Sequence, residues 1–600
     1  MSRASVAVVA LLVLMVVGVS GTAWGQVSPF TRVEFEDDGR VMVTLDGERV
    51  QLVSIAGLPV DELVSVSKHE FGTGWKKRIG EDLLEVLGAA EVGLDRANAI
   101  DLEVRDADEV RLIEDAPMTA NNRRQVWQFN SERLEADREA TISPASLDAL
   151  ADVIHERHAY ATLRNIDLDR AVAVERHRLG EFASKSEVRL AAQRIVSQLG
   201  DGHASVEDWT EARNAVPGRL PFLLASAEGG VAAFASRSGG LLDERHPFAV
   251  SIDGRPLDDW IAAVAPYVPA GSPQLVRERS LRLLRYFGFA RAQTGMVPAP
   301  QVTIRLRSSD GDSETEMTME LVDRRTLYGV WPRTVSGQLG ARIAMLRLPS
   351  MQPPSGRPSD DVWQRELRDE LVRLTRNASG LIIDVRGNGG GRRLPILAIM
   401  PMLMEVGGEP VVVNAAQARL WPGQPHARPG GYLDNRFLWP ESWEGWTGAE
   451  RAAIERFKAG FEPQWTAPAG TMSEWHYMVV SPGDAELPRF DGPVVVLMDE
   501  VCFSATDIFL AALGELPHVT LVGTPSAGGS AKSRDHEAMG LEVTLASMAS
   551  YQPSGQMYDG NGVQPDIVVQ KKPGDHVHGG GDAQLDAAID LLSSQIHERR

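Results

Sequence analysis

Four short, predominantly apolar runs constrain the fold of this chain most strongly. They cover residues 343–348, 381–385, 494–498 and 519–522, and helical patterns separate them. Strands that are apolar along most of their length are buried on both faces, as in a mostly parallel sheet covered by helices. The sequence therefore predicts an α/β sandwich domain, placed at 326–600 and ended by a C-terminal helix.

The rest of the chain requires further domains, because 600 residues are too many for one hydrophobic core. Apolar residues at helical spacing predict a helical domain at 141–215. Residues 216–325 have the strand, turn and helix pattern of a PDZ-like module, a unit that binds peptide tails at a sheet edge. An N-terminal module at 26–140 precedes these domains. The predicted fold class is α/β multidomain.

Two segments of the chain repeat one local pattern. Residues 54–63 and 251–260 each begin with Ser-Ile, continue through a Gly-x-Pro turn and reach acidic residues that suit a helix N-terminus. The similarity indicates that the module at 26–140 is a diverged copy of the one at 216–325. The alternative is chance similarity between two common strand–turn–helix units.

The N-terminus has the pattern of a secretory signal. Arg3 precedes an apolar run from Val6 to Val19, and Ala23-Trp24-Gly25 places small residues at the cleavage positions. We expect residues 1–25 to be removed and the mature protein to be periplasmic or secreted. A membrane anchor is the alternative, but the run is shorter than the roughly twenty residues of a membrane span. We predict no integral membrane span after cleavage.

Charge restricts the partners. The formal net charge is −21, whereas nucleic acids and anionic membranes attract surfaces rich in Lys and Arg. We therefore expect no nucleic acid partner. The sequence does not determine the oligomeric state.

Aromatic residues gather in one part of the α/β domain. Six of the thirteen tryptophans lie between Trp421 and Trp475, among many Pro and Gly residues. This composition predicts a loop-rich insertion at 415–480. The tryptophans either line a peptide groove or attach the insertion to the core.

A serine follows one of the buried strands directly. Ser504 lies between the apolar run at 494–498 and an apolar helical pattern from Ala505 onward. A serine at a strand-to-helix turn presents its hydroxyl at the positive end of the helix dipole, where the Ala505 amide is available to an oxyanion. Helix capping is an alternative role for the same residue.

Two glycine-containing turns are further candidates. Gly387, Gly389, Gly390 and Gly391 follow the strand at 381–385, and residues without Cβ let backbone amides approach a ligand closely. A phosphate loop would need a Gly-Lys-Ser/Thr sequence, which is missing here, so an oxyanion-binding turn fits better. The second turn, Gly-Asp-Gly-His, ends at His203.

Taken together, these motifs resemble the tail-specific (C-terminal-processing) and tricorn-core family of serine peptidases. The resemblance covers about 145–595 and rests on the GDGH turn, the glycine turn after Asp-Val-Arg, the strand–Ser–helix unit and a GVQPDI strand at 562–567. It implies a ClpP/crotonase-like catalytic domain and polypeptide substrates. It also implies Ser504 as nucleophile, with oxyanion donors at Ala505 and at Gly389 or Gly390.

The family activates its serine in two ways. One branch uses a lysine, and Gly529 occupies the corresponding position here, with Lys532 three residues beyond it. The tricorn-core-like branch uses a histidine base, matched by His203, and an acid before the final strand, where Asp559 replaces the usual glutamate. Asp559 is shorter by one methylene and is alternatively a turn residue. Histidine activation predicts activity that rises through about pH 6–7.

Metal and cofactor sites are not predicted. His155 and His158 miss the zincin spacing by one residue, and the histidines at 576 and 578, before three glycines, suggest a flexible tail. The expected function is an exported peptidase that forms an acyl-enzyme on Ser504. A catalytically inactive protein that binds peptides or apolar ligands, or acts as a scaffold, is the alternative.

Overall fold

The computed structural model describes residues 27–599 except 37–38, 72–74, 91, 93–97, 107–108, 140, 162–165, 181–182, 330, 341, 354–358, 422–432 and 485. The predicted signal at 1–25 lies outside the described residues. The chain divides into two compact units, Met1–Asp137 and Arg138–Arg600. In the described part of the chain, no helix has the length and apolar character needed to cross a membrane.

The first unit is built on an antiparallel sheet with the order β1-β2-β3-β5-β6, and the short β4 pairs with β3. Helices α2, α3 and α4 lie between β4 and β5 in the chain, and α5 follows β6. The bounds are β1 Arg32–Phe35, β2 Val41–Leu45, β3 Glu48–Ile55, β4 Leu58–Pro59, α2 Val60–Phe71, α3 Trp75–Glu81, α4 Leu83–Ala89, β5 Ala99–Asp106, β6 Glu109–Pro117 and α5 Ala120–Glu139.

The second unit contains a sheet with the same plan. Its order is β10-β11-β12-β14-β15, with the short β13 paired to β12. The turns agree in detail, since Ser54 pairs with Pro59 in one sheet and Ser251 with Pro256 in the other. The bounds are β10 Phe222–Ala227, β11 Gly230–Ala235, β12 Phe248–Ile252, β13 Arg255–Pro256, α10 Leu257–Val264, α11 Pro273–Leu283, α12 Phe287–Gln293, β14 Gln301–Arg307 and β15 Glu314–Glu320.

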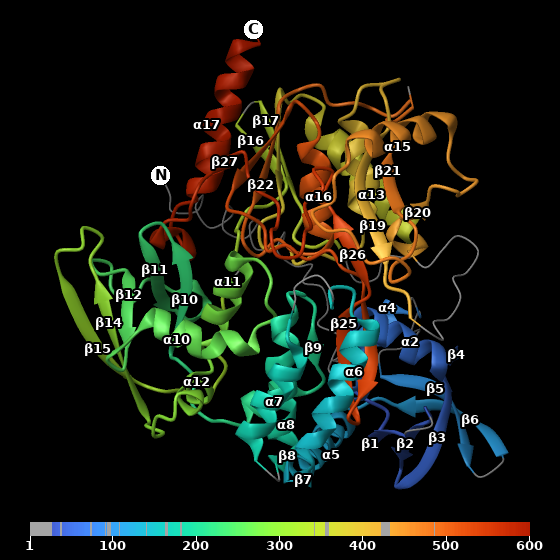
Figure 1. Cartoon of the computed structure of the whole chain (residues 1–600), viewed down its shortest axis with the longest axis vertical. Coiled ribbons are helices and arrows are strands. Elements are labelled where there is room, and N and C mark those ends of the chain that lie inside the picture. Colours follow the sequence, from blue (N-terminus) through green and yellow to red (C-terminus); the bar gives the residue numbers. More distant parts are fainter. Residues whose placement is uncertain are drawn as a thin grey trace, which may run out of the picture. The chain divides into compact units, whose positions relative to one another are not determined.

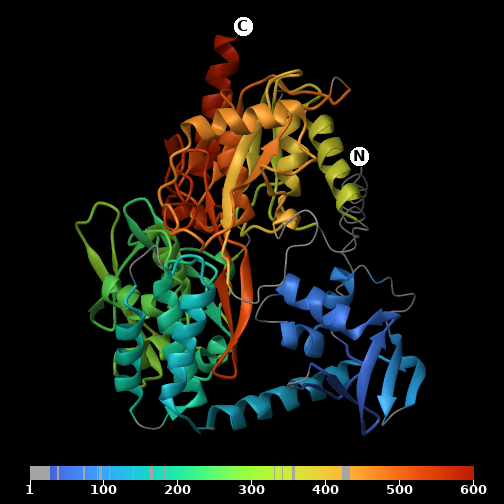
Figure 2. The same ribbon diagram turned by 45° about the vertical axis from the view of Figure 1, so that its right-hand side comes forward.

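A helical region connects to the largest domain through a β-hairpin. Leu541, Val543 and Leu545 of the hairpin join the core formed by the helices, and its second strand pairs with the short strand after the GDGH turn. Figure 2 shows the hairpin running down beside these helices. The bounds are α6 Leu147–Arg157, α7 Leu168–Leu179, α8 Lys185–Val196, β9 Ser205–Val206, α9 Trp209–Asn214, β24 Ser533–Ala538 and β25 Leu541–Ala546.

The largest domain has helices on both faces of a six-stranded sheet (Figure 1). Its order is β16-β17-β18-β22-β23-β27, and all pairs but the first are parallel. Helix α17 packs on one face, while α13, α14 and α16 cover the other. The bounds are β16 Gly337–Leu339, β17 Ile343–Arg347, α13 Asp360–Thr375, β18 Gly380–Asp384, α14 Leu394–Ile399, β22 Val494–Met498, α16 Ala505–Gly514, β23 Val519–Gly523, β27 Ile567–Val568 and α17 Ala583–Glu598.

The tryptophan-rich insertion is more regular than predicted. It contributes three strands of an antiparallel sheet with the order β20-β21-β19-β26, together with a helix. The Trp439 ring stacks on Trp443 at 4.6 Å, and Trp446 is buried beside both. These aromatic contacts favour a packing role for the tryptophans. The bounds are β19 Val411–Ala418, β20 Trp439–Pro440, α15 Gly448–Gly460, β21 His476–Val480 and β26 Met548–Tyr551.

Candidate active site

Ser504 occupies the turn between β22 and α16. The strand is buried along its whole length, and the helix begins at the next residue, Ala505. The backbone of Ser504 has φ 61° and ψ −119°, a conformation that is strained for a residue with a side chain and that recurs at functional sites. Its side chain makes no capping hydrogen bond to the helix. The capping alternative therefore has no support in the geometry.

The glycine turn after β18 lies against this serine. A methyl group on Gly390 would come within 2.7 Å of Ser504 Cβ and 3.1 Å of the Ala505 nitrogen, and Gly390 has φ 103°. The Phe503 amide donates to the carbonyl of Asn388 at 3.1 Å. Only glycine fits this close approach, so the sequence pattern and the contact have one physical cause.

The backbone amides of the two turns differ in availability. The Gly390 amide donates to Asn388 Oδ1 at 2.9 Å and is already engaged. The amides of Gly389 and Ala505 find no acceptor among the described residues. Of the predicted oxyanion donors, Ala505 and Gly389 are thus available in this geometry, whereas Gly390 instead holds the shape of the turn.

His203 lies beside the nucleophile turn. Its imidazole ring contacts the Phe503 ring at a centroid distance of 4.5 Å, and its Nδ1 is buried without a hydrogen-bond partner among the described residues. Burial lowers the pKa of His203 to about 4; Asp201 opposes this shift, and the cations of Arg279 and Arg436 add to it. The imidazole is therefore neutral near pH 7, which is the form a general base needs.

Asp201 shapes the turn that carries His203, a role that the sequence did not reveal. Its carboxylate accepts from the His203 amide at 2.8 Å and from the Ala546 amide of β25 at 2.7 Å. The buried His158 places Nε2 at 3.4 Å from the same carboxylate. Burial alone would raise the pKa of Asp201, but His158 and His203 lower it. The carboxylate thus joins the helical region to the β24–β25 hairpin.

Asp559 meets His203 in space although 356 positions separate them in the sequence. One ligand atom each from Asp201, His203 and Asp559 lies within 4.8 Å of the others. Asp559 is buried, and its Oδ2 accepts from the Tyr160 hydroxyl at 2.9 Å and from the Ser530 amide at 3.1 Å. Such a cluster has the size of a metal site, but backbone amides already bind Asp201 and Asp559, which favours a hydrogen-bonded network.

Asp507 is a second buried acid that the sequence analysis missed. It lies three residues after Ser504 and accepts from the Ser526 hydroxyl and from the amides of Gly528 and Gly529. Burial raises its pKa to about 7. A methyl group on Gly529 would come within 2.1 Å of the Phe503 ring, so Asp507 fixes a loop that supports the ring beside His203.

Lys532 points to the tryptophan-rich insertion. Its Nζ donates to Asn435 Oδ1 at 2.9 Å. Burial lowers the pKa of Lys532 to about 7, and the cations of Arg436 and Arg534 lower it further. The amine is thus poised to lose its proton near neutral pH, while this contact directs it to Asn435.

Comparisons with known proteins relate part of the chain to a peptidase family. Residues 342–569 match the model of Peptidase family S41. Over 299 residues the chain is 26% identical to Tricorn protease homolog 1 of Streptomyces coelicolor (strain ATCC BAA-471 / A3(2) / M145), an alignment that covers 48% of this chain. The alignment covers only 21% of that relative, so this chain spans about a fifth of it.

Solved structures share the fold. Mature CPAF has a TM-score of 0.51 at 16% identity, and mature CPAF complexed with lactacystin has a TM-score of 0.50 at 17% identity. Each comparison covers 76% of this chain and 97% of the other. At this identity the likeness concerns the fold.

Proposed function

We propose that this chain is an exported serine peptidase, because residues 342–569 match the model of Peptidase family S41. It hydrolyses peptide bonds of polypeptides through an acyl-enzyme on Ser504. His203 is the general base, and Asp559 is the acid that orients it. The substrate oxyanion binds to the amides of Ala505 and Gly389.

The chemistry follows from the state of each group. A hydroxyl is a poor nucleophile, so the neutral imidazole of His203 takes the Ser504 proton as the hydroxyl attacks the carbonyl. It then returns that proton to the leaving amine. Asp559 stabilises the imidazolium formed in between. The two amides stabilise the charge that develops on the carbonyl oxygen.

One observation carries this proposal. Gly390 approaches Ser504 so closely that a methyl group would lie 2.7 Å from Ser504 Cβ, in a turn where Ser504 itself has positive φ. Packing alone gives no reason for a strained serine against this glycine turn. A nucleophile beside an oxyanion site accounts for both.

The substrate proposal rests on the second module. The sheet β10-β11-β12-β14-β15 with its helices has the plan we interpret as PDZ-like, and such modules capture chain termini at a sheet edge. We infer that it presents polypeptide tails to a ClpP/crotonase-like catalytic domain. The signal pattern at 1–25 supports a periplasmic or secreted location.

A fluorophosphonate probe tests the proposal. It should label the wild-type protein on Ser504 and fail to label Ser504→Ala, while Ser313→Ala, at an exposed serine, should be labelled like the wild type. A folded wild-type protein that is not labelled would instead support the scaffold alternative. Digestion of a peptide library would then establish the cleavage preference.

A further inference from the structure

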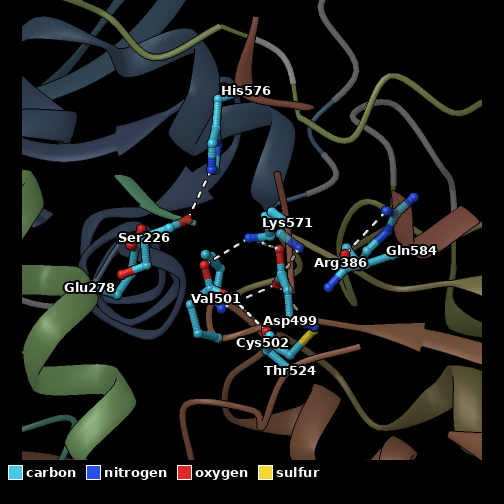
Figure 3. A network of polar contacts seen from close by, with 12 residues as sticks. Ser226, Glu278, Arg386, Asp499, Val501, Cys502, Thr524, Lys571, His576 and Gln584 are labelled. Atoms are coloured by element: carbon cyan, nitrogen blue, oxygen red, sulfur yellow. Dashed lines mark hydrogen bonds and ion pairs between the residues drawn. The ribbon is translucent and has the colours of Figure 1, made fainter. Parts of the chain in front are cut away.

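A buried carboxylate lies at the base of the nucleophile turn. Asp499 follows β22 directly, five residues before Ser504, and is fully buried. Figure 3 shows it among charged and polar side chains that come from distant parts of the sequence. It does not contact the candidate catalytic residues, so the mechanism above leaves it without a role.

One oxygen of this carboxylate joins the two turns of the site. Asp499 Oδ1 accepts from the amide of Gly387, at the start of the glycine turn, at 2.9 Å. The same oxygen accepts from the amide of Val501, in the nucleophile turn, at 3.1 Å. Asp499 thus connects the two turns, and the separation between the amides of Gly389 and Ala505 depends on this connection.

The other oxygen binds a buried cation. Asp499 Oδ2 accepts from Lys571 Nζ at 3.0 Å, and Lys571 also donates to Glu500 at 2.7 Å. Glu500 accepts from the Thr524 hydroxyl at 2.6 Å. Burial alone would raise the pKa of Asp499, but Lys571 and the Gly387 amide lower it to about 2. Asp499 is thus ionised, and its charge is compensated.

Lys571 is itself fixed from the other side. Its carbonyl accepts from the Glu228 amide at 2.7 Å. Five residues further on, His576 Nε2 is 2.9 Å from the Ser226 carbonyl (Figure 3). The imidazole of His576 also stacks on the Phe234 ring. The expected flexible tail at this histidine is therefore wrong, because these contacts with β10 and β11 bury the side chain. The ammonium group is held in place by ordered backbone.

We propose that Asp499, with Lys571 as its counterion, is a positioning residue that sets the geometry of the oxyanion site. This inference rests on the proposed peptidase function. The carboxylate acts through the backbone of the two turns and does not touch the substrate. Because an oxyanion needs donors at about 2.7–3.1 Å, a small opening between the turns weakens binding of the transition state more than binding of the substrate.

The ion pairs of the neighbouring Arg386 lack such a link between the two turns. Arg386 pairs with Asp384 at 2.7 Å and with Asp582 at 2.6 Å, which attaches β18 to the start of α17. Asp384 accepts from the Arg386 amide but from no other amide of the glycine turn among the described residues. Asp499 differs because its acceptor oxygen serves both turns at once.

Two substitutions of Asp499 separate positioning from stability. Asp499→Ala removes the acceptor, so we expect kcat for a peptide that the wild type cleaves to fall about 100-fold, with KM within about threefold. Affinity for a peptide boronate, which mimics the tetrahedral state, should fall by a similar factor. Asp499→Asn keeps an acceptor oxygen for both amides, so we expect it to retain at least a tenth of the wild-type kcat.

Controls make each outcome decisive. Arg194→Met breaks another buried ion pair, with Glu175, and should leave kcat per folded molecule unchanged. If Asp499→Ala does not fold, Lys571→Met should lower kcat about tenfold while Lys571→Arg stays within threefold. Normal labelling of Ser504 in the wild type with unchanged kcat in a folded Asp499→Ala or Lys571→Met variant would overturn this inference alone. A wild type without labelling would overturn the peptidase proposal and this inference with it.

Discussion

The sheet of the first unit and the sheet β10-β11-β12-β14-β15 have the same strand plan, but the side chains around them make different contacts. Each has a bulge before the Ser-Ile pair and a residue with positive φ in the turn, Ala56 in one and Asp253 in the other. In the first unit, Arg78 pairs with Asp82 and Arg123 donates to the Glu81 carbonyl, all within that unit. Backbone plan alone therefore does not determine what a module does.

In the second module, residues in and next to helix α11 donate hydrogen bonds to loops around the active site. Ser272 donates to the Ala527 carbonyl at 2.5 Å and Gln274 to the Ser526 carbonyl at 2.6 Å, both in the loop held by Asp507. Arg279 donates to the Gly202 carbonyl at 2.7 Å, next to His203. These side-chain contacts thus support the turn that carries His203, and they distinguish this module from the first unit.

The largest expected effect concerns the base that this support holds. His203→Ala should lower kcat/KM by about 1,000-fold or more with the fold retained, because the variant lacks the imidazole that accepts the Ser504 proton. Lys532→Ala should stay within about threefold. Steady-state kinetics with a peptide that the wild type cleaves measures both losses, and circular dichroism is the folding control. A reversed order of the two losses would assign activation to the lysine.

Next in size is the contribution of α11 itself. Arg279→Met removes the bond to the Gly202 carbonyl and the contact of the guanidinium with the Phe503 ring at 4.8 Å. Misplacement of the base should lower kcat about 10- to 100-fold. Arg78→Met, on α3 of the first unit, should leave kcat unchanged. Equal effects of the two variants on kcat would contradict the claim that only the second module supports the base.

A smaller effect is expected on tail recognition. If the second module binds a terminal carboxylate, amidation of that terminus should slow cleavage of a long polypeptide about tenfold, since a charge-assisted contact is lost. A short reporter peptide with a blocked terminus should be cleaved as fast as its free form. Equal rates for free and amidated polypeptides would limit the module to structural support.

The smallest effect concerns stability at the matched turn position. Asp253 accepts from the Thr303 amide at 2.9 Å and pairs with the buried Arg291, whereas the first unit has Ala56 there. Asp253→Ala should cost about 3 kcal/mol, because it leaves Arg291 without its counterion. Ala56→Gly, in the same backbone conformation, should change stability by under about 1 kcal/mol. Urea unfolding followed by tryptophan fluorescence compares them, and similar midpoints for both variants would contradict this difference.

The fold was predictable where the signal is local. The apolar run at 494–498 coincides with β22, and Ser504 lies at its turn as expected, because strand burial and glycine geometry leave marks on consecutive residues. The supporting acids were not predictable in this way. Asp499 acquires its role from Lys571, 72 positions away, and Asp201 from Ala546, 345 positions away. Such roles exist only once the chain has folded.

The pH dependence of activity also could not be predicted from the sequence alone. An unperturbed imidazole predicts activity that rises through about pH 6–7, but burial lowers the pKa of His203 to about 4. A general base must be unprotonated, and a lowered pKa keeps the imidazole unprotonated at lower pH. The rise in activity with pH therefore moves toward pH 4–5. The Lys532 amine, with a pKa of about 7, would instead give a rise near pH 7.

The rate of fluorophosphonate labelling of Ser504 as a function of pH tests the central claim most directly. The account predicts a rise between about pH 4 and 5 that persists in Lys532→Ala, and labelling at least 100-fold slower in a folded His203→Ala protein. A rise near pH 7 that is lost in Lys532→Ala, together with normal labelling of His203→Ala, would contradict it.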